Sequence, residues 1–240
     1  MLSLSPTARC YAATAMAVVA WAIPCLSAPA APFTDLDFEQ ASVVPTSFPP
    51  YVEAGPAFPG WTALINDHPI STVLYDSVGA GEVDVALWDM GSPGHLGQLL
   101  QGRFMAALIR DGSHPYTASL TQSGDIPPGS QSIRLLGDGG RGPVLIFING
   151  AQVPLVRLDG VPISGFIDTY GGDVSSFAGQ TVQLALRSLQ DTPQSAWAVD
   201  DISFSGMPIP EASATPLAVV IAFCLRYRRR PTMEVASWMD

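Results

Sequence analysis

The sequence predicts an all-β protein built as a β-sandwich, and three observations carry this prediction. Short runs of alternating apolar and polar residues recur across residues 33–205, and such alternation is typical of half-buried strands. The chain of 240 residues holds 22 Gly and 22 Pro, which separate the runs as turns. Charged residues make up only 13% of the chain, and low charge with frequent Gly and Pro favours short strands over long helices.

The expected strands follow one another at intervals of roughly 8–15 residues, a spacing typical of β-sandwiches. In chain order they are Thr34 to Glu39, Ser71 to Ser77, Val83 to Asp89, Arg103 to Arg110, Tyr116 to Thr121, Gln131 to Leu136, Val144 to Asn149, Gln152 to Leu158, Thr181 to Leu189 and Ala196 to Ser205.

Two local signals refine this series. Asn149-Gly150 separates two of the runs and is the strongest short-range hairpin signal. A single short helix is expected from Val174 to Phe177, with Asp173 as its N-cap and Gly179 as its stop. The sandwich is expected to occupy residues 31–208 as one domain, because both ends of the chain have a different character.

Residues 1–30 have the pattern of a secretory signal peptide. Arg9 supplies a positive start, Tyr11 to Ile23 is an apolar stretch too short to span a bilayer easily, and Ala28-Pro29-Ala30 offers a cleavage site. Two alternatives stay open: a lipoprotein signal with Cys25 as the lipidated residue, and an ordinary buried N-terminal helix.

Residues 209–230 form a second terminal pattern, and residues 231–240 follow as a short tail. Pro210-Glu211-Ala212 comes first and the apolar run Leu217 to Leu225 follows. The run ends in an arginine cluster, which stops transfer and leaves the positive end in the cytoplasm. A C-terminal helix packed on the domain is the alternative, although such a cluster is hard to bury. The cluster consists of Arg226, Arg228, Arg229 and Arg230.

This order of parts resembles the PEP-CTERM sorting signal of Gram-negative bacteria, in which a Pro-Glu-Pro motif precedes a hydrophobic helix and a basic cluster. Ala212 stands where the family has its second Pro. The resemblance implies that Pro210, Glu211 and the arginine cluster form a sorting motif read by an exosortase-type processing enzyme. It also implies a secreted or cell-envelope protein that is anchored in the membrane before its C-terminus is processed.

The central residues 31–208 are strongly acidic and free of cysteine. They hold six Arg against eighteen Asp and Glu, a formal net charge of −12, which would repel phosphate backbones and excludes nucleic acid as a partner. Cys10, Cys25 and Cys224 all lie in the terminal segments. The domain is therefore expected to fold without disulfides or a cysteine-bound metal.

Three patches of the central region resemble the galactose-binding-like jelly rolls, a family that includes carbohydrate-binding modules and extracellular adhesive domains. The patches are Asp37-Phe38-Glu39, Val199 to Phe204, and Tyr170 to Val182. The first two resemble the first and last strands of that fold, which lie close together. The resemblance implies a jelly-roll β-sandwich flanked by the N-terminal signal helix and the C-terminal hydrophobic helix.

The same resemblance implies a structural Ca²⁺ between the first and last strands. Glu39 and Asp201 match the ligand positions, with Asp200 as a substitute. Ca²⁺ takes six to eight oxygen ligands, and carboxylates with loop carbonyls can supply them. The alternative is that these acids cap turns or face water.

Carbohydrate is the expected ligand class, and a sugar site needs aromatic platforms with polar rims. Most of the candidate aromatics are better explained as core residues on alternating strands, so no ligand-binding residue is assigned. An exposed position is considered for Trp61, because it follows Pro59-Gly60. The candidates are Trp61, Tyr75, Trp88, Tyr116 and Trp197.

The sequence offers no catalytic constellation. His68, His95 and His114 lack metal-ligand spacing, and no Gly-x-Ser-x-Gly motif is present. Asp200 and Asp201 would alternate across a strand and could not both face one substrate. We therefore expect a non-enzymatic, exported cell-surface or extracellular-matrix protein. A secreted glycan-active hydrolase, with two acids converging from distant loops, is the alternative.

Overall fold

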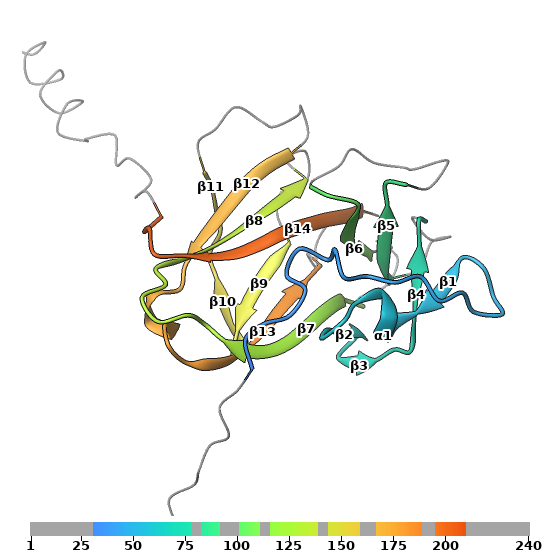
Figure 1. Cartoon of the computed structure of the whole chain (residues 1–240), viewed down its shortest axis with the longest axis horizontal. Helices are drawn as coiled ribbons and strands as arrows, with labels where there is room; N and C mark the ends of the chain where they lie inside the picture. The colour runs from blue at the N-terminus through green and yellow to red at the C-terminus, as the bar shows by residue number, and fades with distance from the viewer. Residues whose placement is uncertain are drawn as a thin grey trace, which may run out of the picture.

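A computed structural model describes residues 31–77, 83–91, 101–110, 116–138, 144–158, 167–188 and 195–209. Two β-sheets pack face to face in this part of the chain (Figure 1), which confirms the β-sandwich. The predicted signal peptide, the apolar C-terminal run and the predicted sorting motif from Pro210 to Arg230 lie outside the described residues.

The larger sheet has eight strands, and all neighbours run antiparallel except β4 and β5, which are parallel. The final strand β14 lies in its interior, between β6 and β8. The order across the sheet is β1 (Tyr51–Glu53), β4 (Thr72–Tyr75), β5 (Asp84–Asp89), β6 (Phe104–Arg110), β14 (Ser195–Ser205), β8 (Ser132–Asp138), β12 (Ile167–Asp173) and β11 (Val156–Arg157).

The smaller sheet has six strands and is antiparallel throughout. The chain crosses between the sheets several times, for example from β6 to β7 and from β13 to β14. A short helix α1 (Ala54–Ala57) follows β1, and the 3-10 turn η1 (Ser175–Phe177) precedes β13. The order is β10 (Ala151–Val153), β9 (Leu145–Ile148), β13 (Thr181–Arg187), β7 (Ala118–Asp125), β2 (Thr62–Ile65) and β3 (His68–Pro69).

The main core lies between the sheets, where alternate residues of each strand meet. Leu87, Leu108 and Trp197 come from the larger sheet and Leu120 and Ile146 from the smaller one, and each is at most 1% exposed. The larger sheet is also buried on its outer face, so β5 and β6 are buried along their whole length and are apolar apart from charged end residues. This outer cluster includes Leu74, Ala86, Trp88, Met105, Ala107, Ile109, Leu136, Ile167, Ala196 and Ala198.

The structure differs from the predicted strand Thr34 to Glu39, which was wrong. Asp35 and Phe38 have left-handed φ angles of 51° and 57°, which a strand cannot hold. The Phe38 amide donates to the Asp35 carbonyl, and the Asp35 side chain accepts from the Gln40 amide at 2.8 Å. A side-chain-stabilised turn therefore replaces the strand, and it places Phe38 in the core with no exposed surface.

The predicted run Gln152 to Leu158 is two strands rather than one. The hairpin at Asn149-Gly150 is confirmed, with φ angles of 50° and 79° that suit a tight two-residue turn. After β10, Pro154 has no amide proton to continue a ladder, and the chain crosses to the other sheet as β11.

A helical turn forms before β13, as expected, but its N-cap residue is Val174 rather than Asp173. The Asp173 carboxylate still accepts the Ser175 amide at 2.8 Å, and Gly179 has a left-handed φ of 73°. The element is a single 3-10 turn, Ser175–Phe177.

Candidate functional site

The N-terminal segment lies against β14, so the two chain regions that resemble the first and last strands of a jelly roll are adjacent. The Ile202 amide donates to the Leu36 carbonyl at 3.0 Å. The Phe33 and Phe204 rings stack with their centroids 5.5 Å apart. This contact brings together acidic residues that are more than 150 positions apart in the sequence.

The three predicted metal ligands all lie at this junction. The Glu39 Oε1 atom accepts the amides of Arg103 and Phe104 at 2.7 and 3.0 Å. Asp200 is 1% exposed, and its two oxygens accept the amides of Gln101 and Asp201. Asp201 is half-buried.

A bulge changes how Asp200 and Asp201 are presented. The register of β14 against β8 shifts between Asp200 and Ser203, and Asp201 has a left-handed φ of 46°. Regular alternation is interrupted at a bulge, so strand periodicity alone does not determine the directions of these two carboxylates.

Two further acids, Asp35 and Asp37, complete what we call the acidic junction: Asp35, Asp37, Glu39, Asp200 and Asp201. Asp35 is 4% exposed, and its Oδ2 atom is buried without a hydrogen-bond partner. Asp35 was not predicted as a site residue, because the sequence pattern of this segment indicated a strand.

The electrostatics of the acidic junction disfavour a full set of negative charges. Burial raises the pKa of Asp200 to about 8, and the charges of Glu39 and Asp201 add to the effect. Burial, with the nearby Asp37 and Glu39, likewise raises the pKa of Asp35 to about 6, although the Gln40 amide opposes it. A bound cation would relieve this repulsion. In the arrangement described, no three His, Cys, Asp or Glu side chains already converge as a metal-binding group.

A second, well-paired charge network adjoins the acidic junction. Arg103 donates from Nε and Nη2 to the two oxygens of Asp89, at 2.9 and 2.8 Å. The Tyr75 hydroxyl donates to Asp89 at 2.6 Å and the Gly91 amide at 2.7 Å. Arg103 is the main cause that lowers the pKa of Asp89 to about 2. These bonds fix the start of β6, where the Arg103 and Phe104 amides also donate to the Glu39 carboxylate.

A polar groove lies along β1, which is an edge strand of the larger sheet. Residues 44–46 cover the free edge of β1: the Glu53 amide donates to the Val44 carbonyl at 2.9 Å, and the Thr46 amide donates to the Tyr51 carbonyl at 3.1 Å. On its other side β1 pairs with β4, where Glu53 stands opposite Thr72. Residues 44–46, β1, β4 and α1 together form the groove.

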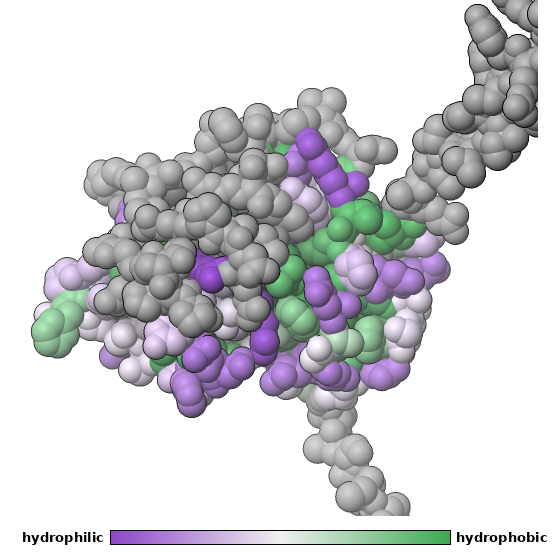
Figure 2. Space-filling model, turned by 180° about the vertical axis from the view of Figure 1, so that it is seen from behind, coloured by the Kyte–Doolittle hydropathy of each residue, from purple (hydrophilic) through white to green (hydrophobic). Residues whose placement is uncertain are grey.

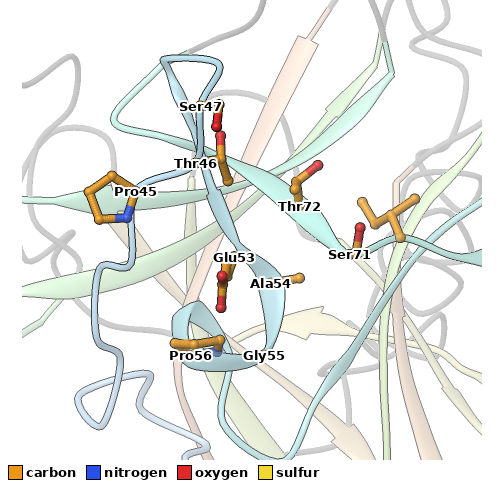
Figure 3. A pocket seen from close by; sticks show the side chains of 10 residues that line it. Pro45, Thr46, Ser47, Glu53, Ala54, Gly55, Pro56, Ser71 and Thr72 are labelled. Carbon is orange, nitrogen blue, oxygen red and sulfur yellow. The ribbon is translucent and has the colours of Figure 1, made fainter.

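The groove has a volume of about 790 Å³, within the range of roughly 300–1,000 Å³ that suits drug-sized ligands. Figure 3 shows Glu53 in the middle of the group, with Thr46 and Ser47 above it and Ser71 and Thr72 to one side. Hydroxyl groups and one carboxylate thus dominate its polar lining. The lining residues are Pro45, Thr46, Ser47, Glu53, Ala54, Gly55, Pro56, Ile70, Ser71 and Thr72.

A smaller pocket of about 270 Å³ continues the groove and adds two aromatic rings. It is lined by Thr46, Phe48, Tyr51 and Thr72, so Thr46 and Thr72 belong to both. Phe48 is 77% exposed, and in Figure 2 a hydrophobic projection stands out at the end of the molecule that carries β1. The Tyr51 amide donates to the Phe48 carbonyl at 2.9 Å, which closes the turn that presents the ring.

The aromatic residues considered from the sequence lie elsewhere. Trp61, Trp88 and Trp197 are 6%, 8% and 1% exposed, so the core interpretation is confirmed for them and an exposed Trp61 is wrong. Tyr75 is half-buried against Asp89, and Tyr116 is 46% exposed away from the groove. Phe48 and Tyr51 were missed because they flank Pro49-Pro50 in a segment without strand alternation.

No protein-family model and no curated protein matches the chain. Among solved structures, an apo-form cyclase from Fischerella sp. is 15% identical with a TM-score of 0.40, covering 72% of this chain and 93% of the cyclase. A family 11 carbohydrate-binding module from Clostridium thermocellum, in complex with a β-1,3-1,4-mixed-linked tetrasaccharide, is 10% identical with a TM-score of 0.34, covering 63% and 92%. Similarity at this level leaves the function to be argued from the chain's own residues.

The described residues cover only part of two expectations from the sequence, those on the histidines and on a membrane-spanning helix. Of the three histidines, His68 is exposed in β3, whereas His95 and His114 lie outside the described segments. Within those segments there is no helix long and apolar enough to cross a membrane.

Proposed function

We propose that this chain is an exported, non-enzymatic surface or extracellular-matrix protein whose β-sandwich binds carbohydrate in the groove beside β1. The observation that carries the proposal is the exposed Phe48 ring next to Tyr51, at one end of a groove lined with hydroxyl groups. Aromatic faces accept the apolar C–H faces of sugar rings, while hydroxyls exchange hydrogen bonds with sugar hydroxyls.

The hydroxyl groups of the groove have two different roles. The Thr46 hydroxyl stabilises its own turn, because Oγ1 donates to the Tyr51 carbonyl at 2.9 Å and accepts the Phe48 amide at 3.2 Å. The other three hydroxyls suit sugar binding. Ser47 and Ser71 are exposed and Thr72 is half-buried. A hydroxyl can both donate and accept, which matches the mixed hydrogen-bonding demand of a sugar.

The groove supports binding better than hydrolysis. Glycosidases need a pair of carboxyl groups on either side of the scissile bond, whereas Glu53 is the one acid among the described residues that line the groove. The alternative, a secreted glycan-active hydrolase, would have to draw on a second acid from elsewhere in the chain.

We take the domain to be a jelly roll of the galactose-binding-like kind. Its support is the repeated crossing between sheets and the contact of the N-terminal segment with β14. Ca²⁺ is proposed as a structural ion at the acidic junction, with Glu39, Asp200 and Asp201 as ligands and the buried, unpartnered Asp35 oxygen facing the same charge cluster. Bound Ca²⁺ would supply positive charge that holds the N-terminal segment against β14.

Calorimetry tests the ion directly. Adding Ca²⁺ to the chelator-treated protein should raise its melting temperature, since an ion that binds only the folded state stabilises it. The variant Asp201→Asn should lose most of this increase, while Asp173→Asn, an exposed acid at the end of β12, should keep it. An unchanged melting temperature in the unmodified protein would remove the site.

Export and sorting are proposed from the terminal sequences alone. Fusing residues 206–240 to a reporter, in hosts with and without an exosortase, tests the C-terminal signal. Processing of the reporter only in the host with the enzyme supports the sorting signal. A reporter of identical size and location in both hosts would contradict it.

Carbohydrate binding is tested by applying the full chain to a glycan array and, in parallel, to a hydrolysis screen. Binding without turnover supports the proposal. Turnover that is abolished by one Asp or Glu substitution would establish the hydrolase instead, and the absence of both would leave the groove without this role.

A further inference from the structure

We infer that the groove selects carbohydrate chains that carry free, protonated amino groups, such as oligomers of a deacetylated amino sugar, and that Glu53 is the residue that selects them. This inference rests on the carbohydrate-binding function proposed above and adds the chemical class of the ligand. Three features of the described groove lead to it: the sign of its charge, the availability of the Glu53 carboxylate, and the position of that carboxylate among the hydroxyls.

The groove has one carboxylate among its described lining residues and no basic side chain. Its described lining contains Glu53 but no Lys, Arg or His. Uronic acids, sulfated sugars and phosphates would therefore meet a like charge without a compensating cation. The acidic domain around it, with a formal net charge of −12 over residues 31–208, attracts cationic chains and repels anionic ones.

The Glu53 carboxylate takes no part in the hydrogen bonds and ion pairs that stabilise the described part of the fold. Glu53 ends β1 and stands at the N-cap of α1, yet its side chain makes no capping hydrogen bond. Its backbone amide is used by the Val44 carbonyl, and its side chain is exposed. Within the described residues its carboxylate has no hydrogen-bond or ion-pair partner.

The position of Glu53 matches a sugar amine flanked by hydroxyls. Figure 3 shows its side chain between the segment that carries Thr46 and Ser47 and the strand that carries Thr72. A ligand that covers the carboxylate removes its water, and this loss is costly unless a cation or strong donors replace it. A protonated amine supplies both charge and donors, whereas an N-acetyl group supplies one neutral donor.

The experiment measures affinities of the full chain for four probes of equal length: a glucosamine oligomer, its N-acetylated form, a neutral glucan and a uronic acid oligomer. We expect the order amine over neutral over uronic. The variant Glu53→Gln should lower affinity for the amine oligomer about three- to fivefold, the range of an exposed charge pair, and leave the two neutral probes unchanged. The matched control Asp173→Asn removes one exposed negative charge at the end of β12, which lies towards the opposite edge of the larger sheet from β1 (Figure 1).

The possible outcomes distinguish failure of this inference from failure of the proposed carbohydrate binding. Selective loss in Glu53→Gln alone supports the inference. Equal binding of the amine and neutral probes, with no effect of Glu53→Gln, overturns it but leaves carbohydrate binding intact. Equal losses in Glu53→Gln and Asp173→Asn overturn it in favour of general charge attraction. If no probe binds, both proposals fail, and Glu53-dependent binding of a basic peptide alone would point to a protein partner.

Discussion

At the scale of single residues, the molecule contrasts carboxylates that are well paired with others that are crowded. Asp89 is 1% exposed and receives hydrogen bonds from Arg103, Tyr75 and Gly91. Asp200 is equally buried, but its bonds come from backbone amides and its neighbours are acids. The first group is stabilised as an anion by the fold, and the second would need a cation or a proton.

Asp89 should make the protein sensitive to acid. Its folded pKa of about 2 lies below the ordinary value of 3.8, so its contribution to stability is complete above that ordinary value and is lost as the pH falls towards 2. Arg103→Gln should lower the melting temperature by several degrees at pH 7, and the difference from the unmodified protein should shrink steadily between pH 4 and pH 2.

The control for this prediction is Arg187→Gln. Arg187 pairs with Asp67, but the two side chains are 37% and 68% exposed, so the pair is screened by solvent. Its variant should show no comparable pH-dependent difference. A gap between Arg103→Gln and the unmodified protein that stays constant down to pH 2 would contradict the role given to Asp89.

At the scale of elements, turns and bulges do as much as strands to place functional side chains. The turn at Asp35 to Phe38 and the bulge at Asp201 bring the acidic junction together. The turn from Thr46 to Tyr51 holds the Phe48 ring out into solvent. Two of these features come from side-chain-supported turns, and the third comes from an irregularity within the strand β14.

Hairpin geometry can be tested with a pair of glycines. A Cβ at Gly150 would meet no atom within 4 Å, but its φ is 79°, so Gly150→Ala should cost about 1 kcal/mol through backbone strain alone. Gly206, after β14, has only an ordinary contact at 3.7 Å and no positive φ, so Gly206→Ala should stabilise by about 0.5–1 kcal/mol. Urea denaturation measures both, and equal effects in the two variants would refute this account.

Phe48 should act as the aromatic platform of the groove. Phe48→Ala should weaken binding of the preferred glycan about tenfold, as expected for an aromatic anchor, while its high exposure should leave the melting temperature unchanged. Tyr116→Ala removes another exposed aromatic ring outside the groove and should leave affinity unaltered. Titration calorimetry gives both numbers; equal affinities for Phe48→Ala and the unmodified protein would exclude the ring from the site.

At the scale of the whole molecule, the sequence predicts the sandwich well because its strands follow simple rules. β13 alternates, and the interiors of β5 and β6, Val85 to Trp88 and Phe104 to Ile109, are continuous apolar runs because both faces of their sheet are buried. β12 was missed as a strand because Gly171 and Gly172 interrupt its pattern. A Cβ at these glycines would lie 2.4 Å from Ile209 and 2.5 Å from Val153, so close packing rather than periodicity selects them.

The sequence pointed to candidate residues only through the resemblance to a family. That resemblance singled out Glu39, Asp200 and Asp201 as candidates, whereas Asp35 became a candidate only once its segment proved to be a turn. The groove joins Phe48 and Glu53 to residues 70–72 across β1 and β4. That juxtaposition depends on strand pairing, which no local pattern in this Pro-rich segment encodes.

Carbohydrate binding beside β1 is tested by an NMR titration of the isotope-labelled protein with its best glycan. We expect the amide shifts to cluster in residues 44–56 and 70–74. Shifts concentrated instead on β6, β14 and β8, or no shifts at saturating glycan, would contradict it.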